Sequence, residues 1–258
     1  MVSAMKKHEK SVYYDEELVD PFSPDRKDFL VKAEHLMRYN FAKDYLRRNA
    51  KEGLKAVYDV ACGNGYGTKI LSRLSTRIIG LDKTRFFLED AKSKSPSPNT
   101  SFYYVDLDTT SLRDFIRKKR LPKPDAVISF ETIEHLNRPD IFVRQIYSVI
   151  APGGYFICSV PNARYEPTVG GKPRNIFHKH LFRKKDIIRL IEQNNFRIIG
   201  IWGQPYTNII VNYFRWMTRY LDRTMLKSKE RFERYAKIAY PKRFLRSLTY
   251  SFIIIAQK

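Results

Sequence analysis

Short apolar runs alternate with stretches of helical periodicity along most of the chain. Seven runs rich in Val, Ile, Tyr and Phe predict β-strands, at residues 56–60, 77–81, 101–105, 125–130, 155–160, 197–202 and 248–256. Apolar positions three and four apart predict helices at residues 25–49 and 68–74, in a segment ending near residue 94, around residues 115–116, and at residues 139–150 and 184–194. Strands and helices that alternate at this spacing indicate an α/β domain whose parallel sheet carries helices on both faces.

The last two predicted strands are separated by residues 205–247, a segment long enough to need helices of its own. Apolar residues fall at helical spacing within it, and Arg215, Arg219 and Arg223 step by four along a neighbouring face. Such a basic amphipathic helix could pack on the sheet, cover an acceptor or contact a membrane surface. We predict a single domain over residues 1–258, divided into a helical cap (1–55), a cofactor-binding core (56–204), a helical insertion acting as acceptor lid (205–247) and the last strand (248–258).

Length and composition agree with one folded domain. The chain has 258 residues, of which 43% are hydrophobic and 14% aromatic, so it can bury a large core. No window approaches the ~18 uninterrupted apolar residues of a membrane span, and the N-terminal residues lack the apolar core of a signal peptide. The two cysteines, Cys62 and Cys158, fit buried positions better than a disulfide or a metal site. These features predict a cytoplasmic protein.

Positive charge is concentrated in the C-terminal part of the chain. The formal net charge is +21, and residues 161–258 contain 21 Lys and Arg against 6 Asp and Glu. A basic surface favours anionic partners, so a phosphate-bearing, lipid-linked or RNA acceptor and peripheral contact with a membrane are all compatible with it. The same charge also serves simply to keep a surface hydrated.

The first predicted strand runs into a glycine-rich turn, Asp59-Val60-Ala61-Cys62-Gly63-Asn64-Gly65-Tyr66-Gly67. Small residues let the backbone bend sharply and approach a ligand, and the helix that follows presents N–H groups suited to a carboxylate or phosphate. Asp82 ends the second strand, 19 residues after Gly63, where its carboxylate can accept hydrogen bonds from both ribose hydroxyls. The two features together predict a cofactor of the nucleoside type.

The glycine spacing disfavours NAD and ATP. Thr68 occupies the place of the third glycine in a G-x-G-x-x-G fingerprint, and Gly67-Thr68-Lys69 does not supply the Gly-Lys-Ser/Thr of a P-loop. The pattern D-x-x-C-G-x-G-x-G instead resembles the cofactor loop of class I S-adenosylmethionine-dependent methyltransferases. In that family the turn holds the methionine portion of the cofactor.

The resemblance continues beyond this loop. Asp106, followed by Leu107, matches the acidic position that receives the adenine amino group, and residues 128–136 and 150–157 resemble the signatures of strands four and five. Ala61 departs from the family, which has glycine there. The resemblance implies S-adenosylmethionine as cofactor and a seven-stranded Rossmann-like sheet, mostly parallel with an antiparallel last strand. The cofactor-binding residues that we predict are Arg38, Asp59, Ala61, Gly63, Asn64, Gly65, Asp82, Asp106, Leu107 and Phe130.

Residues flanking these motifs indicate a narrower group within the methyltransferases. Residues 34–42, Pro161-Asn162 and residues 175–178 are similar to a bacterial methyltransferase-domain group (type 11/23-like) linked to glycan modification. This similarity implies O-methylation of a sugar, a glycan or another small acceptor. Acceptor specificity in the superfamily resides in extra segments such as residues 205–247, which the resemblance does not cover.

Methyl transfer from a sulfonium is an in-line displacement, so the protein mainly aligns the two reactants and excludes water. A hydroxyl acceptor must also lose its proton. His135, just past the fourth strand, is the candidate general base, although it could instead cap a helix or pack. His178 or His180, in the loop after the fifth strand, could replace it. Arg38 is the candidate partner for the methionine carboxylate, and Phe130 could face the sulfonium or the adenine.

Two alternatives remain. Glu131, Glu134 and His135 fall at i, i+3 and i+4 if a helix begins there, and with His178 or His180 they could bind Mg²⁺ or another divalent ion. That arrangement resembles the small-RNA 2′-O-methyltransferases, but the intervening loop is shorter than in that family and no aromatic-rich RNA-binding module accompanies it, so a metal is not favoured. The fold could also bind its cofactor only to regulate a partner, because a cofactor loop indicates binding and not turnover.

Overall fold

The computed structural model of the chain describes residues 21, 29–50, 53–94, 97–166, 168–173, 175–205, 236–237, 239–243 and 249–258. In the main sheet the strands are β1 (Leu54–Val60), β2 (Ser75–Asp82), β3 (Thr100–Tyr104), β4 (Ala126–Phe130), β5 (Tyr155–Pro161), β8 (Arg197–Pro205) and β9 (Thr249–Gln257). The helices are α2 (Phe29–Asn49), α3 (Tyr66–Leu71), α4 (Arg85–Lys94), α5 (Leu112–Lys118), α6 (Pro139–Val149) and α7 (Lys184–Gln193). Every strand and helix predicted within these residues is present, with ends that differ by a few positions.

The seven strands form one sheet in the order β3-β2-β1-β4-β5-β9-β8. Neighbours from β3 to β5 pair in parallel, whereas β9 runs antiparallel to both β5 and β8. The predicted seven-stranded, mostly parallel sheet with an antiparallel last strand is therefore confirmed. The order reverses direction between β1 and β4, and the crevice at such a switch point is where open α/β sheets bind ligands.

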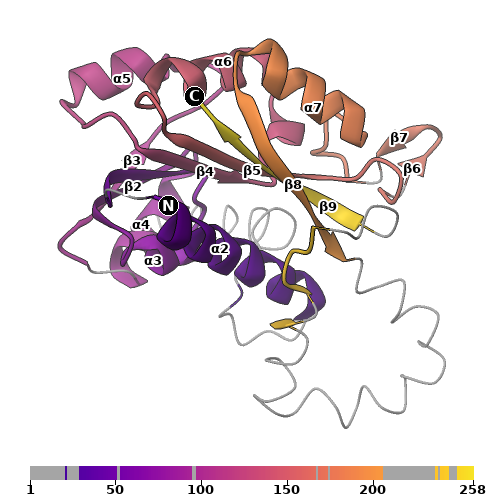
Figure 1. Cartoon of the computed structure of the whole chain (residues 1–258), viewed down its shortest axis with the longest axis horizontal. Coiled ribbons are helices and arrows are strands. Elements are labelled where there is room, and N and C mark those ends of the chain that lie inside the picture. The colour runs from indigo at the N-terminus through magenta and orange to yellow at the C-terminus, as the bar shows by residue number, and fades with distance from the viewer. Residues whose placement is uncertain are drawn as a thin grey trace, which may run out of the picture.

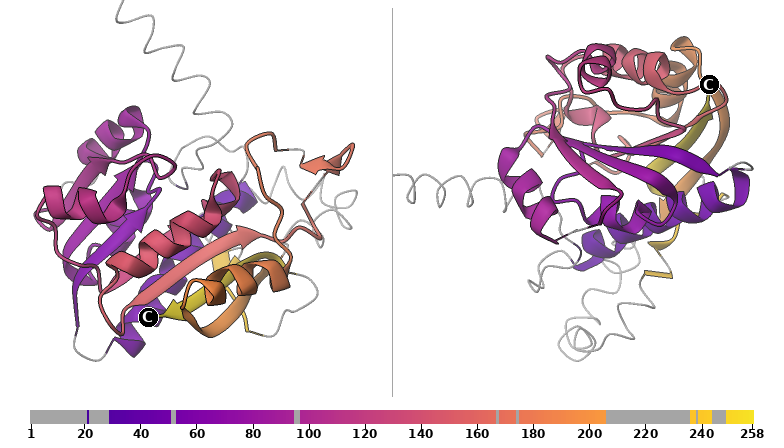
Figure 2. Two further views of the ribbon diagram at one scale, coloured as in Figure 1. Left: turned by 90° about the horizontal axis from the view of Figure 1, so that it is seen from above. Right: turned by 90° about the vertical axis from the view of Figure 1, so that its left-hand side faces the viewer.

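Helices cover both faces of this sheet (Figure 1), and Figure 2 shows the same layers from two further sides. One face packs against α5, α6 and α7 through a core that includes Ile116, Phe142 and Ile187. The other face packs against α2 and α3 through a second core that includes Leu46 and Leu71. Each such side chain contributes roughly 1.5–3 kcal/mol by leaving water, so the two cores hold the strand ends in place.

Two features were not predicted from the sequence. Strands β6 (Thr168–Val169) and β7 (Lys172–Pro173) form a hairpin that extends outward from the sheet (Figure 1). After β4, Glu131 has a positive φ of 48° and the chain forms only a single 3₁₀ turn, η1 (Ile133–His135). Glu131, Glu134 and His135 would share a helical face only if a helix began at Glu131, and the structure does not meet that condition.

The predicted helical insertion, residues 205–247, lies almost entirely outside the described residues, as does the start of the predicted cap. Of the insertion, Tyr240 is described: its ring packs edge-on against Phe41 of α2 at 5.7 Å and its hydroxyl donates to Asp44 at 3.1 Å. The division of the chain into cap, core and insertion stays a prediction. Within the described part of the chain, no helix combines the length and apolar character needed to cross a membrane.

Candidate active site

A cavity of about 290 Å³ opens at the carboxyl ends of the parallel strands. Its wall is made by residues 61–63 after β1, 82–84 at the end of β2, 105–108 after β3 and 130–132 at the end of β4, with further residues from α2 and from the loop after β7. The predicted site residues that line it are Ala61, Gly63, Asp82, Asp106, Leu107, Phe130, His135 and His178. The sheet therefore brings predicted cofactor residues and both predicted catalytic histidines into one space.

Three residues with positive φ bend the chain sharply after β1. Ala61 has a φ of 60°, Gly63 of 54° and Gly65 of 76°. At Gly65 a side chain would also clash, because an added Cβ would lie 2.7 Å from the Cβ of Ala91. Ala61 adopts the left-handed region at a cost of about 1–2 kcal/mol, which glycine at this position would avoid. Ala61 and Gly63 thereby turn the backbone toward the cavity.

Asp82 fixes this turn to the end of β2. Its Oδ2 accepts the backbone N–H of Gly63 at 2.9 Å and its Oδ1 accepts that of Thr84 at 2.8 Å. Each carboxylate oxygen can accept more than one hydrogen bond, so Asp82 can hold the turn and still receive hydroxyl groups from the cavity. Burial raises the pKa of Asp82 above its usual value, although these two N–H groups oppose the rise.

The other acidic position of the predicted cofactor site lies two residues past β3. Asp106 Oδ1 accepts the backbone N–H of Asp108 at 3.0 Å, which fixes the loop that carries Asp106 and Leu107 along the cavity. Neighbouring parallel strands place Asp82 and Asp106 on the same edge of the sheet. The cavity wall therefore contains the carboxyl groups of Asp82 and Asp106 and the apolar side chain of Leu107, a combination that suits the ribose and adenine of an adenosine moiety.

Asp59, Asn64 and Gly65 do not line the cavity, although they were predicted to bind the cofactor. Asp59 is fully buried and accepts hydrogen bonds from the Tyr39 hydroxyl at 2.9 Å and the Thr68 hydroxyl at 2.6 Å. It therefore ties α2 and α3 to β1 and supports the turn from below. The alternation of side chains along β1 could have indicated this buried position. Asp59 lies on the same face of the sheet as Val57, which packs in the core beneath α2.

Between about pH 4 and 6 the free energy of unfolding should fall as the pH rises, more steeply in the wild-type chain than in Asp59→Asn. Burial raises the pKa of Asp59 from 3.8 to about 6. The native state keeps this proton where the unfolded chain has released it, so the stabilisation present below about pH 4 is lost as the pH passes 6. Urea unfolding at several pH values should show a difference of roughly 1–3 kcal/mol between the two proteins. Equal slopes would mean that Asp59 is ionised in the native protein.

Arg38 does not line the cavity either, so its predicted contact with a methionine carboxylate finds no support. Its side chain is 1% exposed. Nε donates to Gln204 Oε1 at 2.7 Å, an amino group donates to Ser251 Oγ at 3.1 Å, and the other lies 3.5 Å from Glu131 Oε1. Arg38 therefore joins α2 to β8 and β9 beneath the site.

Sequence reasoning missed His35, one helical turn before Tyr39, which does line the cavity. Its Nδ1 lies 3.1 Å from the hydroxyl of Tyr66, at the start of α3, and Tyr66 also faces the cavity. Burial, with Arg38 nearby, lowers the pKa of His35 well below its usual value, so its ring is neutral near pH 7. A neutral ring offers a hydrogen-bond acceptor, so His35 and Tyr66 place polar groups on the cavity wall, where Arg38 does not reach.

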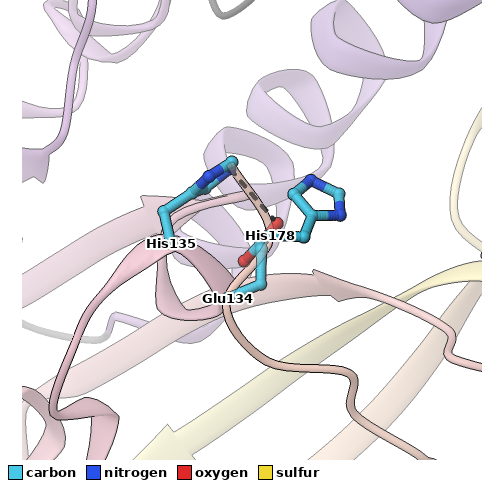
Figure 3. A group of neighbouring side chains, drawn as sticks. All are labelled: Glu134, His135 and His178. Carbon is cyan, nitrogen blue, oxygen red and sulfur yellow. Dashed lines mark ion pairs between the residues drawn. The ribbon is translucent and has the colours of Figure 1, made fainter. Parts of the chain in front are cut away.

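The cavity wall also contains two imidazoles, from η1 after β4 and from the loop after β7. The rings of His135 and His178 lie edge to face, 4.8 Å apart (Figure 3). His135 Nδ1 lies 3.1 Å from the Phe177 carbonyl oxygen, and His178 Nδ1 lies 2.9 Å from Glu166 Oε1. His180, the third candidate, does not line the cavity, and its ring lies beside Phe182 instead. The two predicted catalytic histidines are thus neighbours, each held by a different part of the loop after β5.

Glu134 lies between these rings (Figure 3) and is 1% exposed. Among the described residues neither of its carboxylate oxygens has a hydrogen-bond partner, although Oε1 is 3.9 Å from His135 Nε2. Burial, followed by the nearby charge of Glu131, raises the pKa of Glu134 well above its usual value. Glu131 itself turns toward the sheet, where its Oε1 accepts the Ser159 hydroxyl at 2.8 Å.

Residues 58–158 match the family described as a methyltransferase domain. A Mycolicibacterium smegmatis protein named as a probable S-adenosylmethionine-dependent methyltransferase is 30% identical over 151 residues, covering 57% of this chain and 54% of that protein. The mitochondrial ubiquinone biosynthesis O-methyltransferase of Dictyostelium discoideum is 29% identical over 175 residues, covering 60% of this chain and 53% of that protein. The chain thus spans about half the length of these two relatives.

Among solved structures, the fold is similar to magnesium protoporphyrin IX methyltransferase from Synechocystis PCC 6803 with bound S-adenosylmethionine. The TM-score is 0.60 at 14% identity, over 99% of this chain and 96% of that one. This likeness shows the fold alone, whereas the match of residues 58–158 and the named relatives support a methyltransferase domain of the class I, S-adenosylmethionine-dependent type. The class predicted from the motifs is confirmed, whereas the link to glycan modification stays a prediction.

Proposed function

We propose that this chain is an S-adenosylmethionine-dependent O-methyltransferase that acts on a hydroxyl group of a small acceptor. The observation that carries the proposal is the single cavity, which joins the turn after β1 and the carboxyl groups of Asp82 and Asp106 to the imidazoles of His135 and His178. A cofactor bound along the first group of residues would direct its sulfonium toward the second. The cofactor and the acceptor would then bind to neighbouring parts of one cavity wall.

The residues at the nucleoside end fit S-adenosylmethionine. Asp82 can accept hydrogen bonds from the ribose hydroxyls, and Asp106 can accept one from the adenine amino group. The neutral His35 ring and the Tyr66 hydroxyl lie beside the turn, where the amino and carboxyl groups of the methionine portion would end. When bound, the cofactor supplies a methyl carbon made electrophilic by the adjacent sulfonium.

At the other end, the chain would align the acceptor and assist the loss of its proton. The acceptor oxygen would take the methyl group from the bound cofactor, whose sulfur would keep the electron pair of the broken carbon–sulfur bond, and the hydroxyl proton would have to leave. His135, at the acceptor end, is the candidate base for that proton. An oxygen acceptor is supported by the names of several relatives, which are O-methyltransferases of ubiquinone biosynthesis.

A radiolabelled methyl-transfer screen tests the proposal. The acceptors should include free sugars and lipid-linked glycans, ring hydroxyls of quinol type, and RNA. We expect base-stable label on the oxygen of a small acceptor. Label on RNA alone, with binding that weakens steeply as salt rises, would contradict the proposal and support the RNA alternative. Tight binding of S-adenosylmethionine with no transfer to any acceptor would support a regulatory role instead.

Asp82→Asn should weaken binding of S-adenosylmethionine by roughly 10- to 100-fold, because hydrogen bonds to a charged carboxylate are worth about 1.5–3 kcal/mol. Asparagine retains the shape of Asp82 but accepts through one atom, whereas the N–H groups of Gly63 and Thr84 occupy both carboxylate oxygens. Isothermal titration measures the affinity. Asp114→Asn is the matched control, since the exposed side chain of Asp114 pairs with that of Arg117 on the outer side of α5. Equal affinities of the two variants would remove Asp82 from the cofactor site.

A further inference from the structure

The charge of the cavity wall is opposite to that of the whole chain. The formal net charge is +21, yet among the described residues that line the cavity Lys83 is the only lysine or arginine. The acidic side chains of the wall are Asp82, Asp106, Asp108 and Glu131. The three aspartates lie at or after the ends of β2 and β3, whereas Glu131 follows β4. Glu131 is therefore the acidic side chain of the wall on the acceptor side of the site.

We propose that Glu131 selects the acceptor by charge. Its carboxylate binds hydrogen-bond donors of a neutral or cationic acceptor, and it disfavours an acceptor that carries a phosphate or a carboxylate beside the reacting hydroxyl. The inference rests on the proposed function, because it concerns the acceptor of that reaction. It assigns the positive charge of the chain to surfaces other than this cavity.

Glu131 is held in the wall with one oxygen left for a ligand. Its Oε1 accepts the Ser159 hydroxyl at 2.8 Å and lies 3.5 Å from an amino group of Arg38. Its backbone N–H donates to the Ser159 carbonyl oxygen at 3.2 Å, which fixes a φ of 48° that is unfavourable for glutamate. The side chain is 15% exposed, and among the described residues Oε2 has no partner. Oε2 is thus the atom that can accept from a molecule in the cavity.

Buried oxygens near this end of the cavity lack hydrogen-bond donors. Among the described residues, both carboxylate oxygens of Glu134 and Oε2 of Glu166 are buried without a partner. Glu134 lies between the rings of His135 and His178 (Figure 3), and Glu166 Oε1 lies 2.9 Å from His178 Nδ1. Unpaired buried oxygens destabilise a protein. An acceptor with hydroxyl or ammonium groups brings donors to this region, whereas a phosphate or carboxylate would bring only further lone pairs.

Tyr250, on β9, also lines the cavity and indicates the sign of the electrostatic potential there. Burial raises the pKa of Tyr250 well above its usual value. Three carboxylates raise it further, those of Glu131, Glu166 and Glu34. The guanidinium of Arg38 opposes them with the smallest effect of the four. The potential is therefore negative, so it attracts a cation and repels a phosphate or carboxylate, most strongly where burial limits screening.

Two sets of small hydroxyl compounds test the proposal with the full chain and S-adenosylmethionine. One set is dopamine, catechol and protocatechuate, and the other is glucosamine, methyl glucoside and glucuronate. Each compound is measured as a methyl acceptor and as an inhibitor of transfer to any acceptor that the radiolabel screen identifies. We expect the neutral and amine-bearing members to have KM or inhibition constants at least about 10-fold lower than those of the anionic member of the same set.

Glu131→Gln should reduce this ratio to roughly 3-fold or less, because the amide retains the shape of the side chain but not its charge. Glu192→Gln makes the same change at an exposed position of α7 and should keep the wild-type ratio.

Ser159→Ala tests whether Ser159 positions Glu131. Removing the hydroxyl that Oε1 accepts should lower the ratio by roughly 2- to 10-fold, since the carboxylate is then less firmly oriented. Ser129→Ala is the matched control, because Ser129 is a buried serine of the neighbouring strand whose hydroxyl has no partner among the described residues.

Equal or lower constants for protocatechuate and glucuronate than for their uncharged counterparts, with or without added Mn²⁺, would overturn the inference and leave the proposed function in place. A ratio that is the same in the wild-type chain, Glu131→Gln and Ser159→Ala would also overturn it. Circular dichroism identifies a variant that does not fold, and the other variant then decides. Absence of transfer to every compound of the sets and of the screen would overturn the proposed function, and the inference falls with it.

Discussion

Alanine in place of His135 should lower kcat for methyl transfer by roughly 10²- to 10⁴-fold while the affinity for S-adenosylmethionine changes little. His135 follows β4, beside His178 and Glu134, whereas Asp82 ends β2 and Asp106 follows β3, on the other side of β1, so its removal should affect the acceptor and spare the nucleoside. The measurement is kcat with the acceptor identified by the screen, together with calorimetric titration of the cofactor.

His180→Ala is the control for this experiment, because its backbone N–H donates to the Glu134 carbonyl oxygen next to His135 but its imidazole does not line the cavity. Turnover by His135→Ala at the wild-type rate would exclude His135 from the chemistry. A lower rate leaves two roles to separate. A base acts equally well after treatment with a chelator, whereas a ligand role requires that chelation lowers kcat of the wild-type chain and that Co²⁺ or Mn²⁺ restores it.

Much of the fold could be predicted because the central strands are short apolar runs buried on both faces. The runs at 126–130 and 155–161 are examples in which nearly every residue is buried. Parallel strands connected by helices then determine which ends of the strands lie together. The β6–β7 hairpin escaped prediction because its strands are two residues long and carry no hydrophobic pattern.

The site could be predicted where a residue lies at the tip of a strand. Asp82 and Asp106 were found in this way, because their position along the chain fixes the edge of the sheet at which they lie. Residues on helix α2 could not be assigned similarly, since the rotation of a helix about its axis depends on its partners. For Arg38 the partner is Gln204, 166 positions later in the chain, and no local pattern indicates that contact.

The loop after β5 also makes contacts that no local sequence pattern indicates. His178 was chosen by its residue type, but Glu166, whose carboxylate lies 2.9 Å from it, carries no sequence signal. Glu131 and Glu134 appeared equivalent in the sequence, yet the positive φ of Glu131 turns one carboxylate toward Ser159 and leaves the other between the two rings. Backbone conformation at one residue therefore gives the two acids different partners.

Gly67→Leu should cost more than about 3 kcal/mol of folding stability, and Gly67→Ala roughly 1–3 kcal/mol, since overpacking in a tight core is strongly destabilising. A Cβ on Gly67 would lie 2.1 Å from Cζ of the Tyr39 ring. That ring cannot yield easily, because it packs edge-on against Tyr66 and Phe130 and its hydroxyl donates to Asp59. The same displacement would disturb the turn after β1, so cofactor affinity should fall with stability.

Urea unfolding of the two variants measures the loss. Gly53→Ala is the informative control, because Gly53 has a φ of 73° but open space around its Cβ position, so it reports backbone strain without a clash. Tyr39→Leu, which removes the ring, should reduce the additional cost of Gly67→Ala in a double-mutant cycle. Equal costs with and without the ring would show that α3 does not depend on this contact.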